Sequence, residues 1–542
     1  MDLQTQRLGA RAVGNRFGGF SHQRLEMTNR ASEPSVSSSG LDPTTLSGEL
    51  RASGFRVNPG YPMLYAGDAC ATYTYPAMKS CFGNNPVSPY VIPVVKAWPN
   101  EHVGPTPANV FGPVRAGYVP TYRLGPRDAV VVYGKMPPPG KYMALQTYEW
   151  SQPGHWKAKD YVKWEQAPYR PYPMQYMFET IPPDDRTAGR TWSFASIGDP
   201  VNNVVMQTQS GYPFGKNLYF ITTPSASTDR AVRRVLRAQG VPDSDIFTER
   251  IPNRDELGRI GPLGMGKRAI DFYTFFRYAI PTDPEAARKW WADMPLSVLR
   301  VRGPSSLGPI RRYGMLTYGT RTAQSEAYLR NDLQKLVNAV CDDVRETAGL
   351  RSADCSQPPP TSSIMPAVHD DIGWTAPYCR TINSWCGDQT DAGLFGTKPL
   401  PLDSGEVYAV VDTLATETGN ATYVGLSVNE ASRHFSPTGV TDAALKGSAN
   451  GYAGLIEDSE KFFVHYFTRD CKVLDGLPGL PASCTEISRD MVPQKEDTTV
   501  DGHPALRGMF WPGLREYIAP GPAHGPDTSK LLRPRILTFT KP

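Results

Sequence analysis

The sequence predicts a mixed α+β fold, with a mixed α/β N-terminal region, a long connecting helix, a β-rich C-terminal domain and disulfide-clipped loops. The 542 residues include 49 Gly and 52 Pro. Together these two residue types make up about 19 % of the chain, whereas their average share in proteins is roughly 12 %. So many helix breakers exclude a long-helix or coiled-coil protein. Aromatic residues make up 11 % of the chain, which excludes full disorder. The order of helix-like and strand-like segments supplies the third observation.

Composition shifts along the chain predict its domains. The length of 542 residues corresponds to roughly two to four folding units. Residues 1–55 are rich in Ser, Gly and Arg and are typical of a disordered leader. Residues 56–355 form the mixed α/β domain, and residues 367–542 form the β-rich domain. Residues 356–366 lie between them and carry a Pro/Ser-rich run that is typical of a linker.

The first part of the α/β region is rich in Pro, Gly and Tyr. Residues 57–125 favour irregular structure with an edge strand at Tyr90–Val95, because Pro93 interrupts the apolar run. Two β-rich segments follow, Asp128–Tyr133 and Lys141–Trp150, and a stiff Pro/Gly turn separates them. This pattern predicts a β-hairpin with a long loop.

A β-α-β unit comes next. Asn217–Thr223 is strand-like, and apolar residues then recur at helical spacing from Ser227 until Gly240, which is typical of a helix end. Asp245–Ile251 is the expected returning strand. A further helix is expected from Pro284 to Trp291, followed by a strand at Leu296–Val301.

The longest predicted helix precedes a mainly β region. It spans Thr322 to Thr347, carries a stripe of Leu and Val, and ends at Gly349. Beyond the linker, the expected strands are Glu406–Asp412, Ala421–Val428 and Lys461–Phe467. The segment after the linker is therefore expected to be β-rich.

The cysteines predict disulfides. Eight cysteines fall into four close pairs: Cys70 and Cys81, Cys341 and Cys355, Cys379 and Cys386, Cys471 and Cys484. No CxxC is present, so neither a zinc ribbon nor a thioredoxin-type site is encoded. Short-loop disulfides indicate an oxidising compartment, either extracellular or periplasmic. The alternative is eight reduced, buried thiols.

The N-terminus carries no export signal that would match this location. Residues 1–50 contain several arginines but no apolar run of the kind that a secretory signal requires. We expect the signal to be missing from the sequence as given.

Charge and hydropathy exclude some partners. The net charge of +4 comes from 57 basic and 53 acidic residues, with no basic run, so nothing points to nucleic acid as a partner. The mean hydropathy is −0.40, and no stretch approaches the roughly 18 apolar residues of a membrane-spanning helix. A small molecule or a carbohydrate remains as a partner class; no cofactor and no oligomeric state is predicted.

One glycine-rich loop resembles a phosphate-binding motif only in part. Gly261–Lys267 satisfies GxxxxGK, but Arg268 stands where a P-loop has Ser or Thr for magnesium. A helix is expected after the loop, over Ala269–Tyr278. The favoured interpretation is a flexible glycine loop. The GxSxG and HExxH motifs are absent.

The candidate catalytic residues are His369, Asp370 and Asp371, with His434 supplied by the β-rich domain. Adjacent carboxylates and an imidazole are the groups that acid–base catalysis uses. They predict an extracytoplasmic hydrolase or lyase. The alternative for this segment is a solvated turn.

Further polar residues follow that cluster, up to Asp391, around Cys379 and Cys386. His465 is a second candidate partner from the β-rich domain, although it alternates with phenylalanines as a packed histidine would. A metal site made of lone histidines lacks ligand spacing, so no metal site is predicted.

A second hypothesis rests on aromatic residues between 142 and 192. Exposed rings bind sugars by stacking. The candidate binding residues are Tyr148, Trp150, Trp156 and Trp164. They predict a non-catalytic carbohydrate- or ligand-binding protein. The alternative is that these rings only hold a loop-rich surface together.

Overall fold

The structure, a computed structural model, describes most of the chain from Leu41 onwards. The described residues are 41–66, 69–78, 81, 84–104, 109–153, 189–198, 200–255, 258–315, 321–356, 390–396, 400–430, 435–489, 509–518 and 524–542. All of them belong to one unit, Ser35–Pro542. Seven α-helices and several sheets make up this part, and its C-terminal region is mostly β, which confirms the mixed α+β class.

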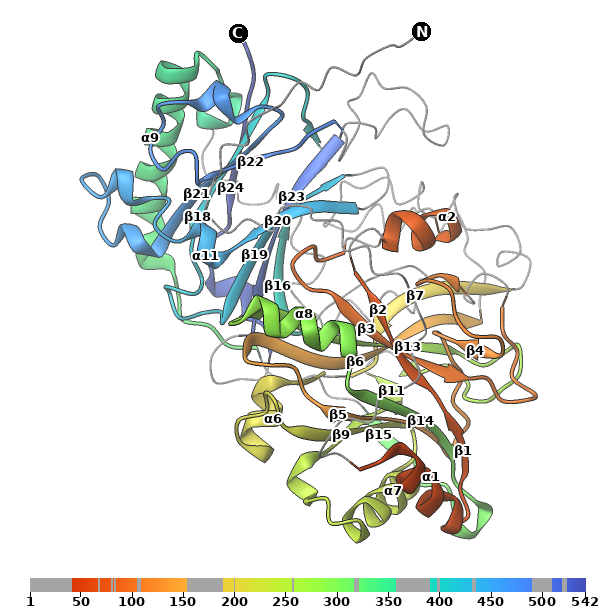
Figure 1. The fold of residues 1–542 in the computed structure, drawn as a ribbon. Coiled ribbons are helices and arrows are strands. Elements are labelled where there is room, and N and C mark those ends of the chain that lie inside the picture. The colour runs from red at the N-terminus through yellow and green to blue at the C-terminus, as the bar shows by residue number, and fades with distance from the viewer. Residues whose placement is uncertain are drawn as a thin grey trace, which may run out of the picture. The chain divides into compact units, whose positions relative to one another are not determined.

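Sheet 1 has the strand order β1-β14-β5-β9-β10. Its strands are β1 (Arg56–Pro59), β14 (Leu296–Arg302), β5 (Asp128–Lys135), β9 (Asn217–Thr223) and β10 (Ile246–Arg250). Helices α1 (Pro43–Ala52) and α7 (Ala226–Ala238) cover one face of this sheet, with one apolar cluster between them and the strands (Figure 1). Part of the predicted leader is therefore the helix α1.

The predicted β-α-β unit is confirmed as β9, α7 and β10. Ser225 caps α7 because its side chain accepts a hydrogen bond from the Thr228 amide. Gly240, at φ 82°, follows the helix in the left-handed region that favours glycine. β9 and β10 then pair in parallel. In this unit the helix propensity, the helix cap and the short connections all favour the same structure.

Sheet 2 has the order β2-β3-β13-β6-β7. Its strands are β2 (Tyr61–Tyr65), β3 (Tyr90–Lys96), β13 (Asp271–Pro281), β6 (Gly140–Pro153) and β7 (Arg190–Ser196), with the short strands β4 (Tyr118–Val119) and β8 (Val201–Asn202) at its margins. Apolar residues from sheets 1 and 2 form one shared core cluster. The two sheets thus pack face to face. A second, aromatic cluster lies on the opposite face of sheet 2.

Three sequence predictions in this region are wrong. β5 and β6 do not form a hairpin, because β5 pairs with β14 and β9 while β6 pairs with β13. The helix expected over Ala269–Tyr278 is largely the strand β13. Its aromatic residues are buried on both faces of sheet 2, which long-range pairing favours over a helix.

β3 is also not an edge strand, since it lies between β2 and β13. Its proline is tolerated because β13 pairs with β3 only at Tyr90 and Val91. On the other side, Pro93 faces Pro62 of β2. Neither proline has an N–H to leave unpaired.

The C-terminal region contains two further sheets. Sheet 3 has the order β16-β23-β19-β20, and sheet 4 has the order β22-β21-β18-β24. Their strands are β16 (Ala392–Gly396), β23 (Met509–Tyr517), β19 (Tyr423–Glu430), β20 (Phe435–Thr441), β22 (Cys484–Glu486), β21 (Phe462–Thr468), β18 (Val407–Thr413) and β24 (Arg535–Phe539), with β17 (Leu400–Pro401) beside β23. Apolar residues of both sheets share one core cluster. β18, β19 and β21 fall where three strands are predicted.

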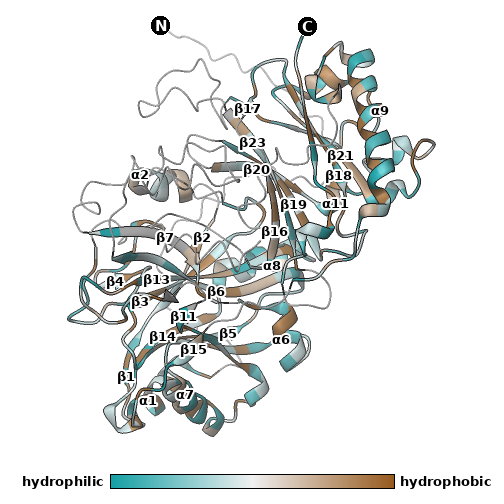
Figure 2. Cartoon of the chain, turned by 180° about the vertical axis from the view of Figure 1, so that it is seen from behind, coloured by the Kyte–Doolittle hydropathy of each residue, from teal (hydrophilic) through white to brown (hydrophobic). Residues whose placement is uncertain are grey.

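Helix α9 (Arg330–Ala348) covers the outer face of sheet 4, with a shared apolar cluster between them (Figure 2). It begins later than predicted, after a short 3-10 turn at Ala327–Leu329. Gly349, at φ 66°, ends it as the sequence indicates. No described helix is long and apolar enough to cross a membrane.

The remaining helices and strands are short. The helices are α2 (Tyr75–Met78), α6 (Asn203–Ser210), α8 (Pro284–Asp293) and α11 (Asp442–Leu445), and the strands β11 (Pro252–Asp255), β12 (Gly258–Arg259) and β15 (Tyr313–Met315) form a small separate sheet. The prediction of a helix followed by a strand is confirmed by α8 and β14. Asp283 caps α8, and Pro284 occupies its first turn.

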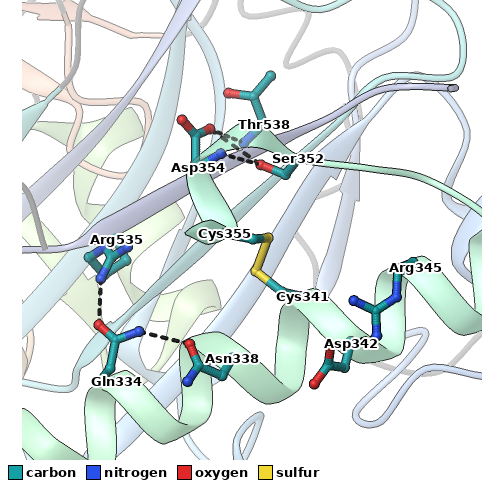
Figure 3. Close-up of a disulfide and its surroundings, with 10 residues drawn as sticks. All are labelled: Gln334, Asn338, Cys341, Asp342, Arg345, Ser352, Asp354, Cys355, Arg535 and Thr538. Atoms are coloured by element: carbon teal, nitrogen blue, oxygen red, sulfur yellow. Dashed lines mark hydrogen bonds and ion pairs between the residues drawn. A yellow bond between two sulfur atoms is a disulfide. The ribbon is translucent and has the colours of Figure 1, made fainter. Parts of the chain in front are cut away.

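Three of the predicted disulfides are present: Cys70–Cys81, Cys341–Cys355 and Cys471–Cys484. Cys341–Cys355 joins α9 to the coil that follows it (Figure 3). Asp354 also fixes this coil, because it accepts a hydrogen bond from the Thr538 amide of β24 at 2.9 Å. The pair Cys379 and Cys386 lies outside the described residues.

Candidate functional site

The clearest unusual side chain is Arg277 of β13, a buried arginine that forms no ion pair with any residue the structure describes. It is 8 % exposed. Its Nη2 donates to the Tyr148 hydroxyl at 2.8 Å, and its Nη1 to Gln146 Oε1 at 3.4 Å. Among the residues that the structure describes, no carboxylate lies within 4.0 Å of the guanidinium. An arginine cannot lose its charge in a protein, so this charge is buried against neutral groups.

Aromatic rings surround the same guanidinium. Its central carbon lies 5.3 Å from the ring centroid of Tyr90, 5.4 Å from that of Tyr148 and 5.3 Å from that of Phe275. Tyr90 and Phe275 stack on each other, with centroids 4.6 Å apart. Cation–π contacts of this kind contribute about 2 kcal/mol when they are desolvated. They hold the guanidinium in place but supply no counter-charge.

Three further tyrosines bring sheet 3 against this part of sheet 2. Tyr423 and Tyr517 stack with centroids 4.4 Å apart, and Tyr142 of β6 lies 5.0 Å from Tyr517. Asn85 Nδ2 donates to the hydroxyls of Tyr517 and Tyr423, at 3.2 and 3.4 Å. Burial raises the pKa of all three phenols. At neutral pH they are therefore uncharged hydroxyl groups.

Asp391, directly before β16, is the carboxyl group of this cluster. It is 0 % exposed. Tyr142 Oη donates to its Oδ2 at 2.8 Å, and Asn202 Nδ2 donates to its Oδ1 at 3.0 Å. Burial raises the pKa of Asp391 to about 7, against the lowering effect of these bonds and of His524 and Arg277. Asp391 can therefore hold or release a proton near neutral pH.

The orientation of Asn202 follows from helix capping. Its Oδ1 accepts hydrogen bonds from the amides of Val204 and Val205 at the start of α6. Because the oxygen faces the helix, the NH2 group of the same side chain must face Asp391. The donor to this carboxylate is thus fixed by the fold.

Hydrogen bonds connect Arg277 with Thr390, the residue that precedes Asp391 in the chain. Thr390 Oγ1 accepts from Gln146 Nε2 at 3.3 Å, and the Oε1 of the same glutamine accepts from Arg277. Arg321 holds the backbone of this turn, because it donates to the carbonyl oxygens of Thr390 and Ala392. The two ionisable groups are therefore held by neighbouring, fixed elements.

Arg277, Gln146, Asp391 and the tyrosine hydroxyls form what we call the Arg277 cluster, lying where β6 and β13 meet β16, β19 and β23. It offers one permanent positive charge, one titratable carboxyl and several neutral donors. The chemistry of this set suits an anion against Arg277 and a single proton gained or lost at Asp391. No group of three metal-binding side chains occurs in the part of the chain that the structure describes.

Most predicted catalytic residues cannot be placed relative to this cluster. His369, Asp370, Asp371 and His434 lie outside the described residues. The first three belong to the segment that ends, in sequence, immediately before Thr390. Their predicted role remains a prediction.

The predicted binding residues divide in the same way. Trp156 and Trp164 lie outside the described residues. Tyr148 and Trp150 are 1 % and 0 % exposed, so these two rings do not form a sugar-binding platform. Trp150 packs edge-on against Phe111 and Tyr273. Tyr148 contributes its hydroxyl to the Arg277 cluster instead.

His465 is a packed histidine. It is 0 % exposed on β21, and its Nε2 lies 2.8 Å from Thr485 Oγ1. Burial lowers its pKa to about 3. It is therefore uncharged at neutral pH, as its alternation with phenylalanines indicates.

The glycine-rich loop does not present a phosphate cradle. Arg190 Nη1 donates to the carbonyl oxygens of Lys267 and Ala269, at 2.7 and 2.8 Å. Arg123 likewise donates to the carbonyl oxygen of Gly266. Asp271 pairs with both arginines. These carbonyls face cations, whereas a P-loop turns amide N–H groups towards its anion.

Comparisons with known proteins add little. No family model matches the chain, and no curated protein matches it. Among solved structures, an uncharacterised protein from Burkholderia cenocepacia is similar over 93 % of this chain and 91 % of its own, with 10 % identity and a TM-score of 0.34. A protein from Vibrio parahaemolyticus is similar over 77 % of this chain and 87 % of its own, with 9 % identity and a TM-score of 0.31. Neither likeness supports a function.

Proposed function

We propose that this protein binds a small organic carboxylate at the Arg277 cluster, in an extracellular or periplasmic setting. The observation that carries this proposal is the buried guanidinium with no carboxylate within ion-pair distance among the described residues. Buried charges in proteins are normally paired, and the planar fork of arginine matches a carboxylate with two parallel hydrogen bonds. The bound anion would supply the missing counter-charge.

The surroundings favour an organic anion over a bare inorganic one. Tyr90, Tyr148 and Phe275 place ring faces around the guanidinium. Such faces pack against the apolar part of a ligand while its carboxylate meets Arg277. A ligand-binding protein is also the second hypothesis from the sequence. The proposed ligand differs, because the tyrosines are buried around Arg277 and do not form an exposed sugar-binding surface.

Titration calorimetry with benzoate tests the proposal, and benzamide is the uncharged control of the same shape. We expect benzoate to bind and benzamide not to bind. Arg277→Met should weaken benzoate binding roughly ten- to a hundredfold, as loss of charge-assisted hydrogen bonds predicts. Arg237→Gln, on the exposed face of α7, is the matched control and should bind as the wild type does. Equal binding by wild type and Arg277→Met would overturn the proposal.

An acid–base enzyme, the hydrolase or lyase that the sequence predicts, is the second candidate. The observation that favours it is Asp391, a buried carboxyl whose pKa is raised to about 7. A group of this kind can act as general acid or base near neutral pH. If it does, Asp391→Asn should abolish turnover of an ester or other carboxylate-bearing substrate while leaving substrate binding intact. Turnover that survives this change would exclude Asp391 as the catalytic group.

A further inference from the structure

Asp391 has an environment that suits two protonation states. Among the described residues, Tyr142 and Asn202 donate hydrogen bonds to its side chain, and both are uncharged. These donors support the ionised carboxylate, whereas complete burial favours the protonated acid. Among the described residues, no cation lies within 4.0 Å of Asp391. The balance between its two states therefore depends on charges slightly further away.

Arg277 is the permanent charge among them. It interacts electrostatically with Asp391, and hydrogen bonds run from Arg277 through Gln146 to Thr390, the residue before Asp391. Without a ligand, ionised Asp391 interacts favourably with the guanidinium, although the two do not form an ion pair. An anion bound to Arg277 would replace this interaction and would face Asp391 as a like charge in a poorly solvated place.

On this basis we infer that anion binding at Arg277 is coupled to proton uptake by Asp391, so that ligand and proton bind together. The step is a simple protonation: the Asp391 carboxylate takes one proton from solvent and becomes a carboxylic acid, while the ligand stays a carboxylate. No bond of the ligand changes. The inference rests on the proposed function, since it needs an anion at the Arg277 cluster.

The other titratable groups around Asp391 do not provide the same exchange. The phenols of Tyr142, Tyr423 and Tyr517 stay protonated at neutral pH, because burial raises the pKa of each. The Tyr148 hydroxyl accepts from Arg277, and the Tyr90 hydroxyl accepts from the Asn85 backbone amide. Arg321 donates to backbone carbonyls, and Arg515 donates to the Ser427 hydroxyl.

Among the described residues, His524 is the remaining titratable neighbour. If it is protonated, it favours the ionised form of Asp391, so it would oppose proton uptake at low pH. Lys141, next to Tyr142 in β6, pairs with Asp442 of α11. Asp391 is therefore the group of this neighbourhood whose proton count should change when an anion binds.

Calorimetry of benzoate binding to the full chain, in two buffers of different ionisation enthalpy, measures the proton uptake directly. Near pH 8 we expect uptake of up to about one proton per benzoate. Above the pKa of Asp391, the affinity should fall about tenfold for each pH unit, because one proton must be recovered for each ligand bound. Near pH 5.5 the uptake should vanish.

Asp391→Asn is the decisive variant, and Asp442→Asn is the matched control. The amide in Asp391→Asn is neutral and can still form hydrogen bonds, so binding should become independent of pH and of the buffer. Asp442→Asn should keep the pH dependence of the wild type. If Asp391→Asn does not fold, the proton count of the wild type alone decides.

The outcomes separate the two proposals. Benzoate binding that needs Arg277 but shows neither proton uptake nor pH dependence overturns the coupling and leaves the proposed function standing. Proton uptake that persists in Asp391→Asn also overturns it, and assigns the proton to His524. Absence of benzoate binding at every pH overturns the proposed function and the coupling with it.

Discussion

Two buried arginines near sheet 2 have opposite environments. Arg123 is 1 % exposed, and its Nε donates to Asp271 Oδ1 at 2.7 Å. Arg277 is similarly buried but contacts neutral oxygens and ring faces. Removing one partner of a buried ion pair strands the other charge. Removing Arg277 strands no ion-pair partner, although Tyr148 and Gln146 each lose one donor. The two residues should therefore respond differently to the same substitution.

Urea unfolding of Arg277→Met and Arg123→Met tests this difference. We expect Arg123→Met to lower the free energy of unfolding by about 3 kcal/mol or more. Arg277→Met should change it by less than about 1 kcal/mol, because methionine keeps the packing and removes an unpaired charge. A loss at Arg277 as large as that at Arg123 would indicate a purely structural role for Arg277.

The sequence points only indirectly to this cluster. The segment that contains Arg277 is aromatic and reads as a helix, so the alternation that places Arg277 on one face of β13 is missed. Asp391 follows the predicted catalytic segment, yet nothing local distinguishes it from other acidic residues. Both acquire their character from long-range contacts with Gln146 and Tyr142, which no local pattern reveals.

At the level of elements, the local sequence pattern predicts helices and strands well, but it predicts poorly which strands pair with each other. The β-α-β unit around α7 forms as expected, because its helix, its cap and its connections are all local. The expected hairpin of β5 and β6 fails because each strand has a better partner far away in sequence, β14 and β13. Alternation specifies the buried face of a strand but not its neighbour.

The sandwich of sheets 3 and 4 contains a second set of buried carboxyls. Glu326 is well satisfied: its carboxylate accepts from Thr413, Thr418, Asn420 and the Leu532 amide. Asp412 Oδ2 and Glu516 Oε2, in contrast, are buried without a hydrogen-bond partner among the described residues. Burial, and then the nearby Glu326, hold the pKa of both groups well above the usual range. Burial therefore favours the protonated form of Asp412 and Glu516 in the folded protein.

These carboxyls predict that the protein loses stability as the pH rises. A carboxyl whose pKa is higher in the folded state stabilises that state. The full contribution is present at pH values below the unfolded-state pKa, about 4, and it is lost as the pH rises through the folded-state pKa. The free energy of unfolding should fall by up to about 1.4 kcal/mol per pH unit for each carboxyl. Urea unfolding at pH values from about 5 to 9 measures this slope.

The double variant Asp412→Asn, Glu516→Gln supplies the comparison. It should unfold with a clearly smaller dependence on pH, because neither amide can lose a proton. Glu417→Gln, a partly exposed carboxyl paired with Lys446, is the control and should keep the slope of the wild type. An unchanged slope in the double variant would show that other groups cause the pH dependence.

The disulfide between α9 and the following coil gives a prediction of its own. The Cys341–Cys355 pair closes a loop with a sequence separation of 14 residues. In the chain-entropy model, a loop of this length stabilises the folded state by about 3 kcal/mol. The double variant Cys341→Ser, Cys355→Ser should lose about that much in urea unfolding. A loss below about 0.5 kcal/mol would show that Asp354 and its bond to β24 suffice to hold the coil.

At the scale of the whole molecule, the cysteines indicate where the protein works. The three described disulfides link neighbouring segments: Cys70–Cys81, Cys341–Cys355 and Cys471–Cys484. The pairing follows the sequence spacing in each case. Disulfides persist in oxidising compartments, which supports the proposed extracellular or periplasmic location.

A thiol count on the native protein checks this location. Alkylation under denaturing conditions, without reductant, followed by mass spectrometry should label no cysteine. After reduction, all 8 cysteines should be labelled. Complete labelling before reduction would mean that the protein works in a reducing compartment.

A crystal structure of the protein with 4-bromobenzoate tests most directly whether Arg277 binds an organic carboxylate. The bromine scatters anomalously, so its position does not depend on interpreting weak density. We expect the carboxylate of the ligand against the guanidinium of Arg277 and the bromine beyond it, and no such peak in crystals of Arg277→Met. A bromine peak elsewhere, or the same peak in both proteins, would contradict this expectation.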